Sequence, residues 1–382
     1  PTPAREEDGG AGRGATPASS GGLTSFAGTP MPPGRACRSV DTFDKLNKID
    51  EGAYGVVYRA RCRRSGDIVA LKQVKLPNVR EGFPVTALRE INLLLSLHHP
   101  HIVNCREMVV GGTMDKIFMV MDFMEHDLKG LMNVMKEPFT ASEVKRLMLD
   151  MLQALEYCHE HWVLHRDLKT SNLLMNNCGM VAIADFGLAR KYAEPLKEYT
   201  TLVVTLWYRA PELLLGGTIY GAEIDVWSMG CIFGELLLKA PLLPGRGEAD
   251  QISQIFALLG SPDAKAWPES RELPLVKKAL FKHQPFNRLR EKFKRGVSFT
   301  GGGAPPISEA GLDLMEAMLT LNPKRRITAK EALAHPYFSE QPPPKPHELM
   351  PTWPSTHDGG KKEKVRSVGE DDQARIAAFH QR

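Results

Sequence analysis

Two short stretches decide the fold of this chain: His165-Arg-Asp-Leu-Lys-Thr-Ser-Asn172 and, soon after, Ala184-Asp-Phe-Gly187. Taken singly, a His-Arg-Asp run is ordinary loop polarity and carries little information. Its meaning depends on whether matching motifs occur on both sides, in the right order and in the right type of element.

The upstream motifs suggest a phosphate site. Asp50-Glu-Gly-Ala-Tyr-Gly55-Val-Val57 lies between two predicted strands. Glycine lets a backbone approach a phosphate and consecutive N–H groups can hold the anion, although a plain hairpin turn would also fit. Val69-Ala-Leu-Lys72 follows, and a lysine in an apolar strand needs an acid or an anion as partner. Glu90 is the candidate counter-ion, an arrangement that equally fits a structural salt bridge.

The hydrophobic pattern predicts a small β-rich lobe followed by a larger, mainly helical lobe, which is an α+β fold. Strand patterns cover Phe43–Ile49, Val56–Arg61, Ile68–Val74, Ile102–Val109 and Ile117–Phe123, with a helix over Thr86–Leu97. Helical patterns then cover Ala141–His159, Glu223–Leu238, Asp250–Leu259, Ser308–Thr320 and Ala329–Ala334. Thr140 and Glu143 form a capping-box pattern at the first of these helices. Ligands commonly bind where two lobes meet, so we expect the chemistry there.

Composition divides the chain into three parts. Residues 1–42 form a Gly/Pro/Ser-rich tail that we expect to be disordered, since it cannot bury enough apolar surface. Residues 43–338 form the ordered domain, with lobes at 43–124 and 125–338 and an exposed loop at Arg295–Pro306. Residues 339–382 form a Pro-rich, charged tail that we expect to pack partly through Met350–Trp353.

The overall composition excludes several classes of protein. Lys and Arg number 49 against 45 Asp and Glu, a net charge of +4, which gives no support to a direct nucleic-acid binder. No apolar run reaches the roughly 18 residues that a membrane span needs. The six cysteines have irregular spacing, so we expect reduced thiols in a cytosolic or nuclear protein.

The full motif set occurs in one order: a Gly-rich turn, Val69-Ala-Leu-Lys72, the two stretches quoted first, and Ala210-Pro-Glu212. This order resembles the eukaryotic protein kinases over about residues 43–338. Pro84-Val-Thr-Ala-Leu-Arg-Glu90 and Val203-Val-Thr-Leu-Trp-Tyr-Arg-Ala-Pro-Glu212 are similar to the PITSLRE-like group of cyclin-dependent kinases, including the plant G-type enzymes. The resemblance implies a bilobal kinase fold, ATP and Mg²⁺ as cofactors, and transfer of the γ-phosphoryl group to Ser or Thr in proteins.

The resemblance also assigns roles in catalysis and nucleotide binding. Asp167 would receive or orient the substrate hydroxyl proton, Lys169 would steady the phosphoryl group, and Thr205 would orient both. Asn172 and Asp185 would hold Mg²⁺, and Lys72, held by Glu90, would bind the α- and β-phosphates. The nucleotide site would comprise Ile49, Asp50, Glu51, Gly52, Ala53, Tyr54, Gly55, Val56, Val57, Ala70, Lys72, Met121, Asp122, Met124, Asp127 and Leu174. For the apolar members of this set, ordinary core packing is the alternative.

Substrate choice and regulation follow from the same resemblance. Arg209 would occupy the backbone carbonyl at Val203-Val204, which favours proline after the phosphorylated residue because proline has no N–H to satisfy. Thr200 matches the activating phosphosite, and Arg89, Arg166 and Arg190 match its arginine cluster. Tyr54 matches an inhibitory phosphosite, whereas Ala53 replaces the usual Thr and Asp50 replaces a glycine.

Partners and location are also implied by the family. By resemblance, a cyclin of the L type would bind the Pro84–Glu90 helix and swing Glu90 towards Lys72. The family works in transcription and pre-mRNA splicing, which implies a nuclear location, and we expect a secondary, cytoplasmic fraction. Glu212 and Arg326 match a structural ion pair and Asp225 a structural anchor.

Two other classes stay as alternatives. A cyclin-binding pseudokinase scaffold would need damage at Lys72, Asp167, Asn172 or Asp185, and all four are intact. A Rossmann dehydrogenase would need glycines that open a helix within alternating βα units. Here the glycines precede a strand.

Overall fold

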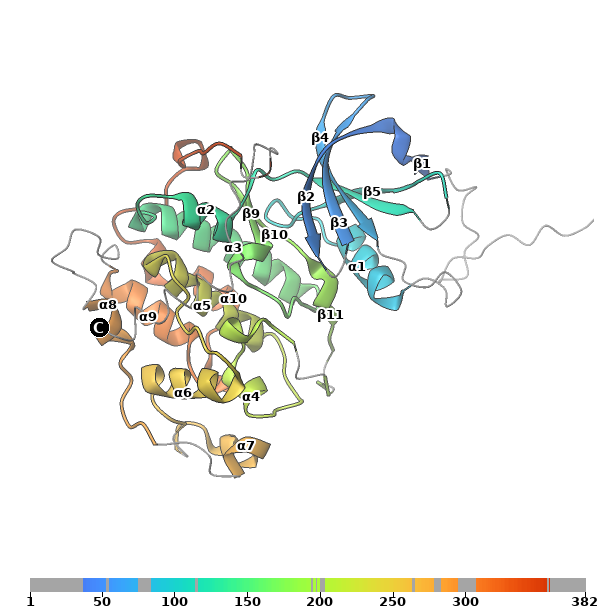
Figure 1. The fold of residues 1–382 in the computed structure, drawn as a ribbon. Coiled ribbons are helices and arrows are strands. Elements are labelled where there is room, and N and C mark those ends of the chain that lie inside the picture. The colour runs from blue at the N-terminus through green and yellow to red at the C-terminus, as the bar shows by residue number, and fades with distance from the viewer. Residues whose placement is uncertain are drawn as a thin grey trace, which may run out of the picture. The chain divides into compact units, whose positions relative to one another are not determined.

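A six-stranded sheet with strand order β1-β5-β6-β4-β3-β2 forms the first lobe (Figure 1). Its strands are β1 (Arg38–Ser39), β2 (Phe43–Gly52), β3 (Gly55–Cys62), β4 (Ile68–Val74), β5 (Cys105–Val110) and β6 (Ile117–Asp122). The pairs between β2, β3, β4, β6 and β5 are antiparallel. This sheet is therefore unlike the parallel sheet of a Rossmann dehydrogenase.

The computed structural model describes residues 37–52, 55–74, 84–113, 116–193, 195–196, 198–199, 203–262, 265–277, 283–294, 307–355 and 357. Most of the predicted N-terminal tail and the whole predicted Arg295–Pro306 loop lie outside this set. Of the described helices, none is long and apolar enough to cross a membrane. All six cysteines lie in the described parts, and all six are free thiols, as expected.

The ordered part begins earlier than the predicted start at Phe43. Strand β1 pairs in parallel with β5, and the Arg38 Nε donates to Glu107 at 2.9 Å. A single turn of 3-10 helix, η1 (Val40–Thr42), follows and buries Val40. The predicted start was wrong because this short segment is held by one long-range strand pair and one ion pair, which leave no periodic apolar pattern.

Helices make up most of the second lobe, as predicted. They are α2 (Leu128–Val134), α3 (Ala141–Glu160), α4 (Pro211–Leu214), α5 (Glu223–Leu238), α6 (Glu248–Leu259), α7 (Pro274–Lys277), α8 (Leu289–Lys294), α9 (Glu309–Met318) and α10 (Ala329–Leu333). Short strands lie among them: β7 (His126–Asp127), β8 (Val163–Leu164), β9 (Leu173–Met175), β10 (Val181–Ile183) and β11 (Arg190–Lys191).

Helix α3 begins where its capping box predicts. The Thr140 side chain accepts from the Glu143 N–H, and the Glu143 carboxylate accepts from the Thr140 N–H at 2.8 Å. These two bonds satisfy groups that the first helical turn leaves without partners. The cap therefore fixes the start of the helix that runs through the centre of the second lobe.

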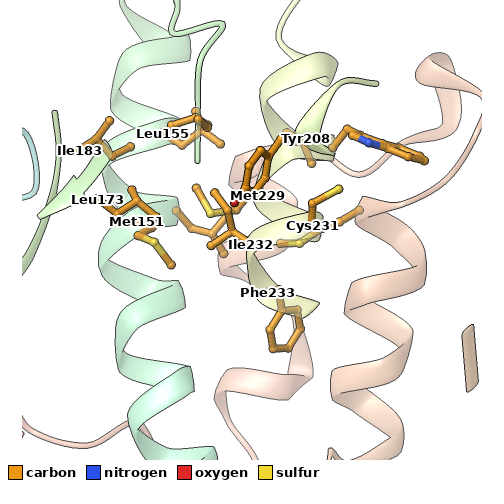
Figure 2. Close-up of a cluster of buried hydrophobic side chains, with 14 of the residues drawn as sticks. Met151, Leu155, Leu173, Ile183, Tyr208, Met229, Cys231, Ile232 and Phe233 are labelled. Atoms are coloured by element: carbon orange, nitrogen blue, oxygen red, sulfur yellow. The ribbon is translucent and has the colours of Figure 1, made fainter. Parts of the chain in front are cut away.

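The core of the second lobe lies between α3, α5 and the β9–β10 pair (Figure 2). Met151 and Leu155 of α3 face Leu173 and Ile183 on one side and Ile232 of α5 on the other. Nearly every residue of α5 is buried. A helix that is apolar on all sides belongs inside a large core, so α5 forms a rigid support for the loops that pack on its N-terminal end.

The two lobes are joined by backbone contacts beside β10. Ile102, predicted as the start of a strand, instead forms an isolated bridge with Ile183. The Val103 N–H donates to the Ile183 carbonyl at 2.9 Å, and the Ile183 N–H donates to the His101 carbonyl at 2.9 Å. Helix α1 (Val85–Ser96) of the first lobe contacts η4 (Phe186–Leu188), which follows β10 directly. Residues from both lobes thus meet at the Ala184-Asp-Phe-Gly187 motif.

Candidate active site

The loop at His165–Asn172 is held in place by a buried carboxylate. Asp225, in the first turn of α5, accepts the N–H groups of His165 at 2.9 Å and Arg166 at 2.8 Å. Burial alone would raise the pKa of Asp225, but hydrogen bonding from His159 and nearby positive charge keep that pKa below its ordinary value. The loop is therefore tied through an ionised group to α5, a helix that is buried along nearly its whole length.

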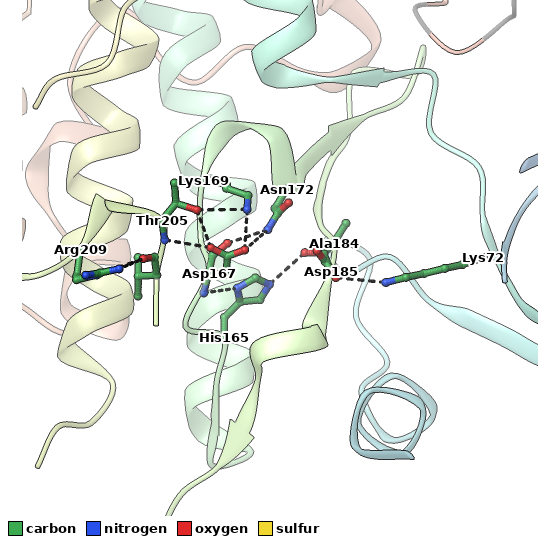
Figure 3. A network of polar contacts seen from close by, with 10 residues as sticks. Lys72, His165, Asp167, Lys169, Asn172, Ala184, Asp185, Thr205 and Arg209 are labelled. Atoms are coloured by element: carbon green, nitrogen blue, oxygen red, sulfur yellow. Dashed lines mark hydrogen bonds and ion pairs between the residues drawn. The ribbon is translucent and has the colours of Figure 1, made fainter. Parts of the chain in front are cut away.

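Asp167 is the centre of a polar network, shown in Figure 3. The Thr205 hydroxyl donates to Asp167 Oδ1 at 2.9 Å, and Lys169 Nζ donates to Oδ2 at 2.7 Å. Asn172 Nδ2 donates to the Asp167 carbonyl at 2.8 Å and to Oδ2 at 3.2 Å. Lys169 Nζ also reaches the Thr205 hydroxyl at 3.3 Å. Asp167, Lys169, Asn172 and Thr205 were all assigned to catalysis, and these four residues therefore lie in one contact group.

Lys72 is buried and bound by two acids from different lobes. Its Nζ lies 2.6 Å from Glu90 Oε1 on α1 and 3.2 Å from Asp185 Oδ1 after β10. Burial opposes the charge on Lys72, but the two carboxylates outweigh burial and raise its pKa. Burial likewise would raise the pKa of Asp185, and the charge of Lys72 outweighs it and lowers that pKa. Lys72 and Asp185 are therefore held in their charged forms.

The Ala184-Asp-Phe-Gly187 motif turns Asp185 towards Lys72. Asp185 has a positive φ of 62°, a conformation that costs energy for a residue with a side chain. Phe186 is fully buried and packs edge-on against the His165 ring at 4.8 Å, and His165 Nε2 lies 3.1 Å from the Ala184 carbonyl. These contacts hold the strained turn and hence the position of the Asp185 carboxylate.

The predicted Gly-rich turn is the β2–β3 hairpin. Gly52 lies opposite Gly55, Glu51 opposite Val56 and Asp50 opposite Val57, while Ala53 and Tyr54 lie outside the described residues. A Cβ on Gly55 would lie 2.1 Å from the Gln73 carbonyl oxygen, so no side chain fits there. The backbone at Gly55 therefore packs closely on β4, the strand that carries Lys72.

The residues predicted to hold adenine lie on neighbouring strands. Ala70 of β4 lies opposite Met121 of β6, and Val57 of β3 lies opposite Lys72. Asp122 ends β6, Met124 follows it, and Asp127 of β7 lies opposite Leu174 of β9. Ile49, Val57, Ala70 and Leu174 are only partly buried, as residues that flank a ligand would be.

Asp127 also has a local structural role. It is the N-cap of α2, and its Oδ1 accepts from the Gly130 N–H at 2.6 Å. Its Oδ2 lies 3.8 Å from Nε2 of His357, a residue that the sequence analysis did not select. His357 Nδ1 also lies 2.8 Å from the Met124 carbonyl. No local signal could have found His357, because it follows a Pro-rich stretch and meets residues more than two hundred positions away.

Arg209 holds the backbone that was predicted to meet the residue after the phosphorylated one. Its Nε donates to the Val203 carbonyl at 2.9 Å, and its Nη2 donates to the Val204 carbonyl at 3.1 Å. Val204 has φ of 64°, in the left-handed region that β-branched residues avoid. The guanidinium thus stabilises a strained turn and occupies both carbonyls.

Comparison with known sequences agrees with this geometry. The protein kinase domain model matches residues 43–338. The chain belongs to the protein kinase family. It is 57% identical over 330 residues to cyclin-dependent kinase G-2 of Oryza sativa subsp. indica, covering 86% of this chain and 46% of that protein. It is 53% identical over 325 residues to human cyclin-dependent kinase 11B, covering 85% of this chain and 40% of that protein.

A shorter relative is matched over more of its length. Cyclin-dependent kinase 11B of Rattus norvegicus is 52% identical over 325 residues, which cover 85% of this chain and 72% of the rat protein. The rice and human relatives are more than twice as long as the part that this kinase matches. The resemblance to the PITSLRE-like and plant G-type cyclin-dependent kinases is thereby confirmed.

Three arginines, Arg89, Arg166 and Arg190, were assigned to the activating phosphosite of this kinase. Burial lowers the pKa of Arg190, and the positive charges of Arg166 and Arg89 lower it further. The Arg166 guanidinium carbon lies 5.9 Å from the centre of the Tyr199 ring. Among the described residues no acid forms an ion pair with any of the three. Thr200 itself lies outside the described residues.

Proposed function

We propose that this chain is a cyclin-dependent Ser/Thr protein kinase that transfers the γ-phosphoryl group of ATP to Ser/Thr-Pro sites in proteins. The observation that carries the proposal is the contact group of Asp167, Lys169, Asn172 and Thr205, with the Lys72–Glu90–Asp185 cluster formed beside it. Phosphoryl transfer passes through an anionic, loosely bonded transition state, so positioning and positive charge supply most of the catalysis. Both groups of residues supply these two effects.

Asp167 would act on the substrate hydroxyl. Its carboxylate is held by Thr205 on Oδ1 and by Lys169 and Asn172 on Oδ2, so its orientation is fixed before substrate binds. In that position the carboxylate orients the hydroxyl and receives its proton. Lys169 lies beside it and would stabilise the negative charge of the phosphoryl group in transfer.

Asn172 and Asp185 fit Mg²⁺ as its protein ligands. Mg²⁺ prefers oxygen donors and is commonly bound by one or two protein groups together with substrate phosphates. The Asn172 amide nitrogen donates its hydrogen bond to Asp167, so the amide oxygen of Asn172 can coordinate the metal. The lowered pKa of Asp185 keeps its carboxylate ionised. When bound, Mg²⁺ would neutralise phosphate charge, while Lys72 of this chain holds the phosphates.

Proline selection rests on Arg209. Because its guanidinium occupies the carbonyls of Val203 and Val204, these acceptors are engaged and a substrate N–H placed there would lack a partner. An unsatisfied donor costs about 1–3 kcal/mol, and proline has no such donor. Peptide libraries should therefore show a preference of roughly 5- to 150-fold for proline after the phosphorylated residue. Equal rates for Ser-Pro and Ser-Ala peptides would refute this part of the proposal.

The α1 helix supports a cyclin partner. Val85, Leu88 and Leu95 are 59%, 44% and 43% exposed, an unusual set of large apolar side chains on the outer side of the helix that carries Glu90. The sequence analysis assigned the Lys72–Glu90 pair to the cyclin-bound form, and this structure has the pair formed. We propose that a cyclin, of the L type by resemblance, covers this helix and stabilises the pair. Leu88→Glu should abolish cyclin binding in a pull-down. Lys129→Glu, on α2 of the second lobe, should leave cyclin binding unchanged.

Activation would depend on Thr200. A phosphate adds about −1.5 to −2 charges and would satisfy the repelling cluster of Arg89, Arg166 and Arg190. Thr200→Ala should lower kcat at least tenfold in the cyclin complex. Full activity of that variant would contradict the proposed switch.

The decisive experiment separates an enzyme from a scaffold. The purified chain is incubated with ATP, Mg²⁺ and a Ser-Pro peptide, with and without an L-type cyclin, beside Asp167→Asn. Transfer that Asp167→Asn abolishes supports the enzyme. ATP binding without transfer, with every cyclin tried, supports the scaffold.

We further propose a nuclear location, with a cytoplasmic fraction, and roles in cell-cycle, transcription or splicing control, by resemblance to the family. The run Lys361-Lys-Glu-Lys-Val-Arg366 is weak support and lies outside the described residues. Imaging of a tagged full-length chain tests the location, and exclusion from the nucleus would refute it.

A further inference from the structure

The segment that follows the last helix packs on the kinase domain over most of its described length. We call residues Ser339–Ser355 and His357 the C-terminal strap; it is the red end of the described chain in Figure 1. Lys145 of α3 donates to the carbonyls of Glu340 at 3.1 Å and Pro342 at 2.8 Å. The Lys345 N–H donates to the Ser142 carbonyl at 3.0 Å. The predicted partial packing at Met350–Trp353 is therefore only one part of a longer contact.

A buried acid anchors the middle of the strap. His347 Nε2 lies 2.9 Å from Oδ2 of Asp150, which is fully buried in α3, and the His347 ring stacks on His101 at 5.9 Å. These three groups have the spacing of a metal site. The Arg146 guanidinium, however, lies 3.6 Å from Asp150 Oδ1 and already balances its charge. The group therefore fits an ionic anchor for the strap better than a metal site.

Close packing fixes the next part of the strap. Met350 is buried, and a Cβ on Gly179 would lie 2.5 Å from both the Met350 Cβ and the His347 carbonyl oxygen. The Trp353 ring then packs edge-on against Phe139 at 6.2 Å and His126 at 6.4 Å. The strap thus follows a defined path towards the junction of the lobes.

The end of the strap reaches the connection between the lobes. The Ser355 hydroxyl donates to the Glu125 carbonyl at 3.1 Å. His357 Nδ1 lies 2.8 Å from the Met124 carbonyl, and Nε2 lies 3.8 Å from Asp127 Oδ2. The His357 carbonyl accepts from Asn47 Nδ2 of β2 at 2.8 Å. One residue of the tail therefore contacts both lobes and two residues assigned to the nucleotide site.

The chemistry of these contacts defines what His357 does. A carbonyl oxygen only accepts, so Nδ1 must carry the hydrogen that is shared with Met124. The ring then stands beside the Asp127 carboxylate, which also accepts from the Gly130 N–H at the start of α2. Burial would raise the pKa of Asp127, but the nearby His357 ring and the hydrogen bond from the Gly130 N–H outweigh burial and lower that pKa. Asp127 is thus kept ionised and oriented by the tail.

We propose that the C-terminal strap completes the nucleotide site and that His357 is a positioning residue, which sets the Met124 backbone and the Asp127 carboxylate for ATP. The inference rests on the proposed ATP-dependent function. Its physical basis is preorganisation: when the tail already holds the two groups, ATP does not have to order them on binding. The link from His357 to Asn47 extends this effect to the sheet that carries the Gly-rich turn.

The test compares four variants of the full chain in the cyclin complex. His357→Ala should raise KM for ATP by roughly 3- to 10-fold, the equivalent of one or two net hydrogen bonds, and leave kcat at saturating ATP within twofold. His357→Asn keeps a donor near the Nδ1 position and should recover part of the loss. His161→Ala, on an exposed histidine at the end of α3, should change neither constant. Trp353→Ala, which loosens the strap away from the nucleotide site, should raise KM in the same direction.

The outcomes separate this inference from the function on which it rests. An ATP KM for His357→Ala within twofold of wild type, in a chain that transfers phosphate normally, overturns the role of His357 and leaves the proposed function intact. If the wild-type chain binds ATP but transfers no phosphate, the same comparison is made with the dissociation constant for ATP by calorimetry. Failure of the wild-type chain to bind ATP at all overturns both. A fall in kcat with unchanged KM would also overturn the inference, because it would place His357 in the chemical step.

Discussion

Replacing Thr205 tests whether the network around Asp167 is catalytic. The Thr205 hydroxyl donates to Asp167 Oδ1 at 2.9 Å and accepts from Lys169 Nζ at 3.3 Å, whereas the Thr205 N–H reaches the same Oδ1 at 3.2 Å. Thr205→Ala removes the two hydroxyl contacts and keeps the backbone contact. The Asp167 carboxylate would then keep only the longer backbone bond on Oδ1, besides its bonds to Lys169 and Asn172 on Oδ2, and its orientation would be less tightly fixed.

The size of the effect follows from the charges involved. A hydrogen bond to a charged group is worth about 1.5–3 kcal/mol, and the 2.9 Å bond should supply most of this. A loss of about 2 kcal/mol from the transition state lowers the rate about 30-fold. Because Thr205 does not touch the residues assigned to adenine, we expect the loss in kcat and little change in KM for ATP.

The assay is steady-state phosphorylation of a Ser-Pro peptide by the cyclin complex, at varied ATP. Thr205→Ser keeps the hydroxyl and should retain most of the activity. In the background of Asp167→Asn, Thr205→Ala should cause almost no further loss, because it acts through the Asp167 carboxylate. A kcat for Thr205→Ala within threefold of wild type, or a Thr205→Ser variant as slow as Thr205→Ala, would refute the reasoning.

Three further predictions concern the charged groups that hold the site. Glu90→Gln leaves the buried Lys72 with one acid in place of two and should lower kcat/KM for ATP by roughly 100-fold, measured in the same assay. Arg326→Met breaks the buried pair with Glu212 and should lower the free energy of unfolding by about 3–5 kcal/mol in urea titrations; adding Glu212→Gln should recover part of it, and no recovery would contradict the pairing. The lowered pKa of Asp225 means that its stabilising contribution is present above its ordinary pKa of 3.8 and is lost as pH falls through the lower folded value. The difference in the free energy of unfolding between wild type and Asp225→Asn should therefore be constant from about pH 5 to 7 and become smaller below about pH 4. A difference that grows on acidification would contradict this prediction.

The sequence was informative wherever the chemistry is local or the motifs have a fixed order. Asp167 and Asn172 belong to one short motif, and the structure brings them into contact at 2.8 Å. The Thr140–Glu143 capping box and the start of α3 are equally local. Lys72 and Glu90 are further apart, but each lies in a motif that fixes its element, and the pairing of a buried strand lysine with a helix acid follows from charge.

The parts that the sequence did not reveal depend on single contacts between distant segments. β1 is ordered by a parallel strand pair and by the ion pair of Arg38 with Glu107, neither of which leaves a repeat in the sequence. The strap has no apolar period, because its contacts come from backbone carbonyls and from isolated side chains such as His347 and Trp353. Composition could indicate only a tail, since it carries no information about where a Pro-rich segment docks.

Asp127 shows why residue type alone cannot separate structure from function. An aspartate at the start of a helix is fully explained as an N-cap, and the bond to the Gly130 N–H at 2.6 Å is that cap. A cap uses one carboxylate oxygen and needs no further partner. The second oxygen faces His357, a residue 230 positions along the chain, which is held there by its own bond to Met124. A helix start does not require a contact over that separation, whereas a site that must present a fixed carboxylate between two lobes does. The position of His357 therefore favours the ligand-binding interpretation of Asp127 over the purely structural one.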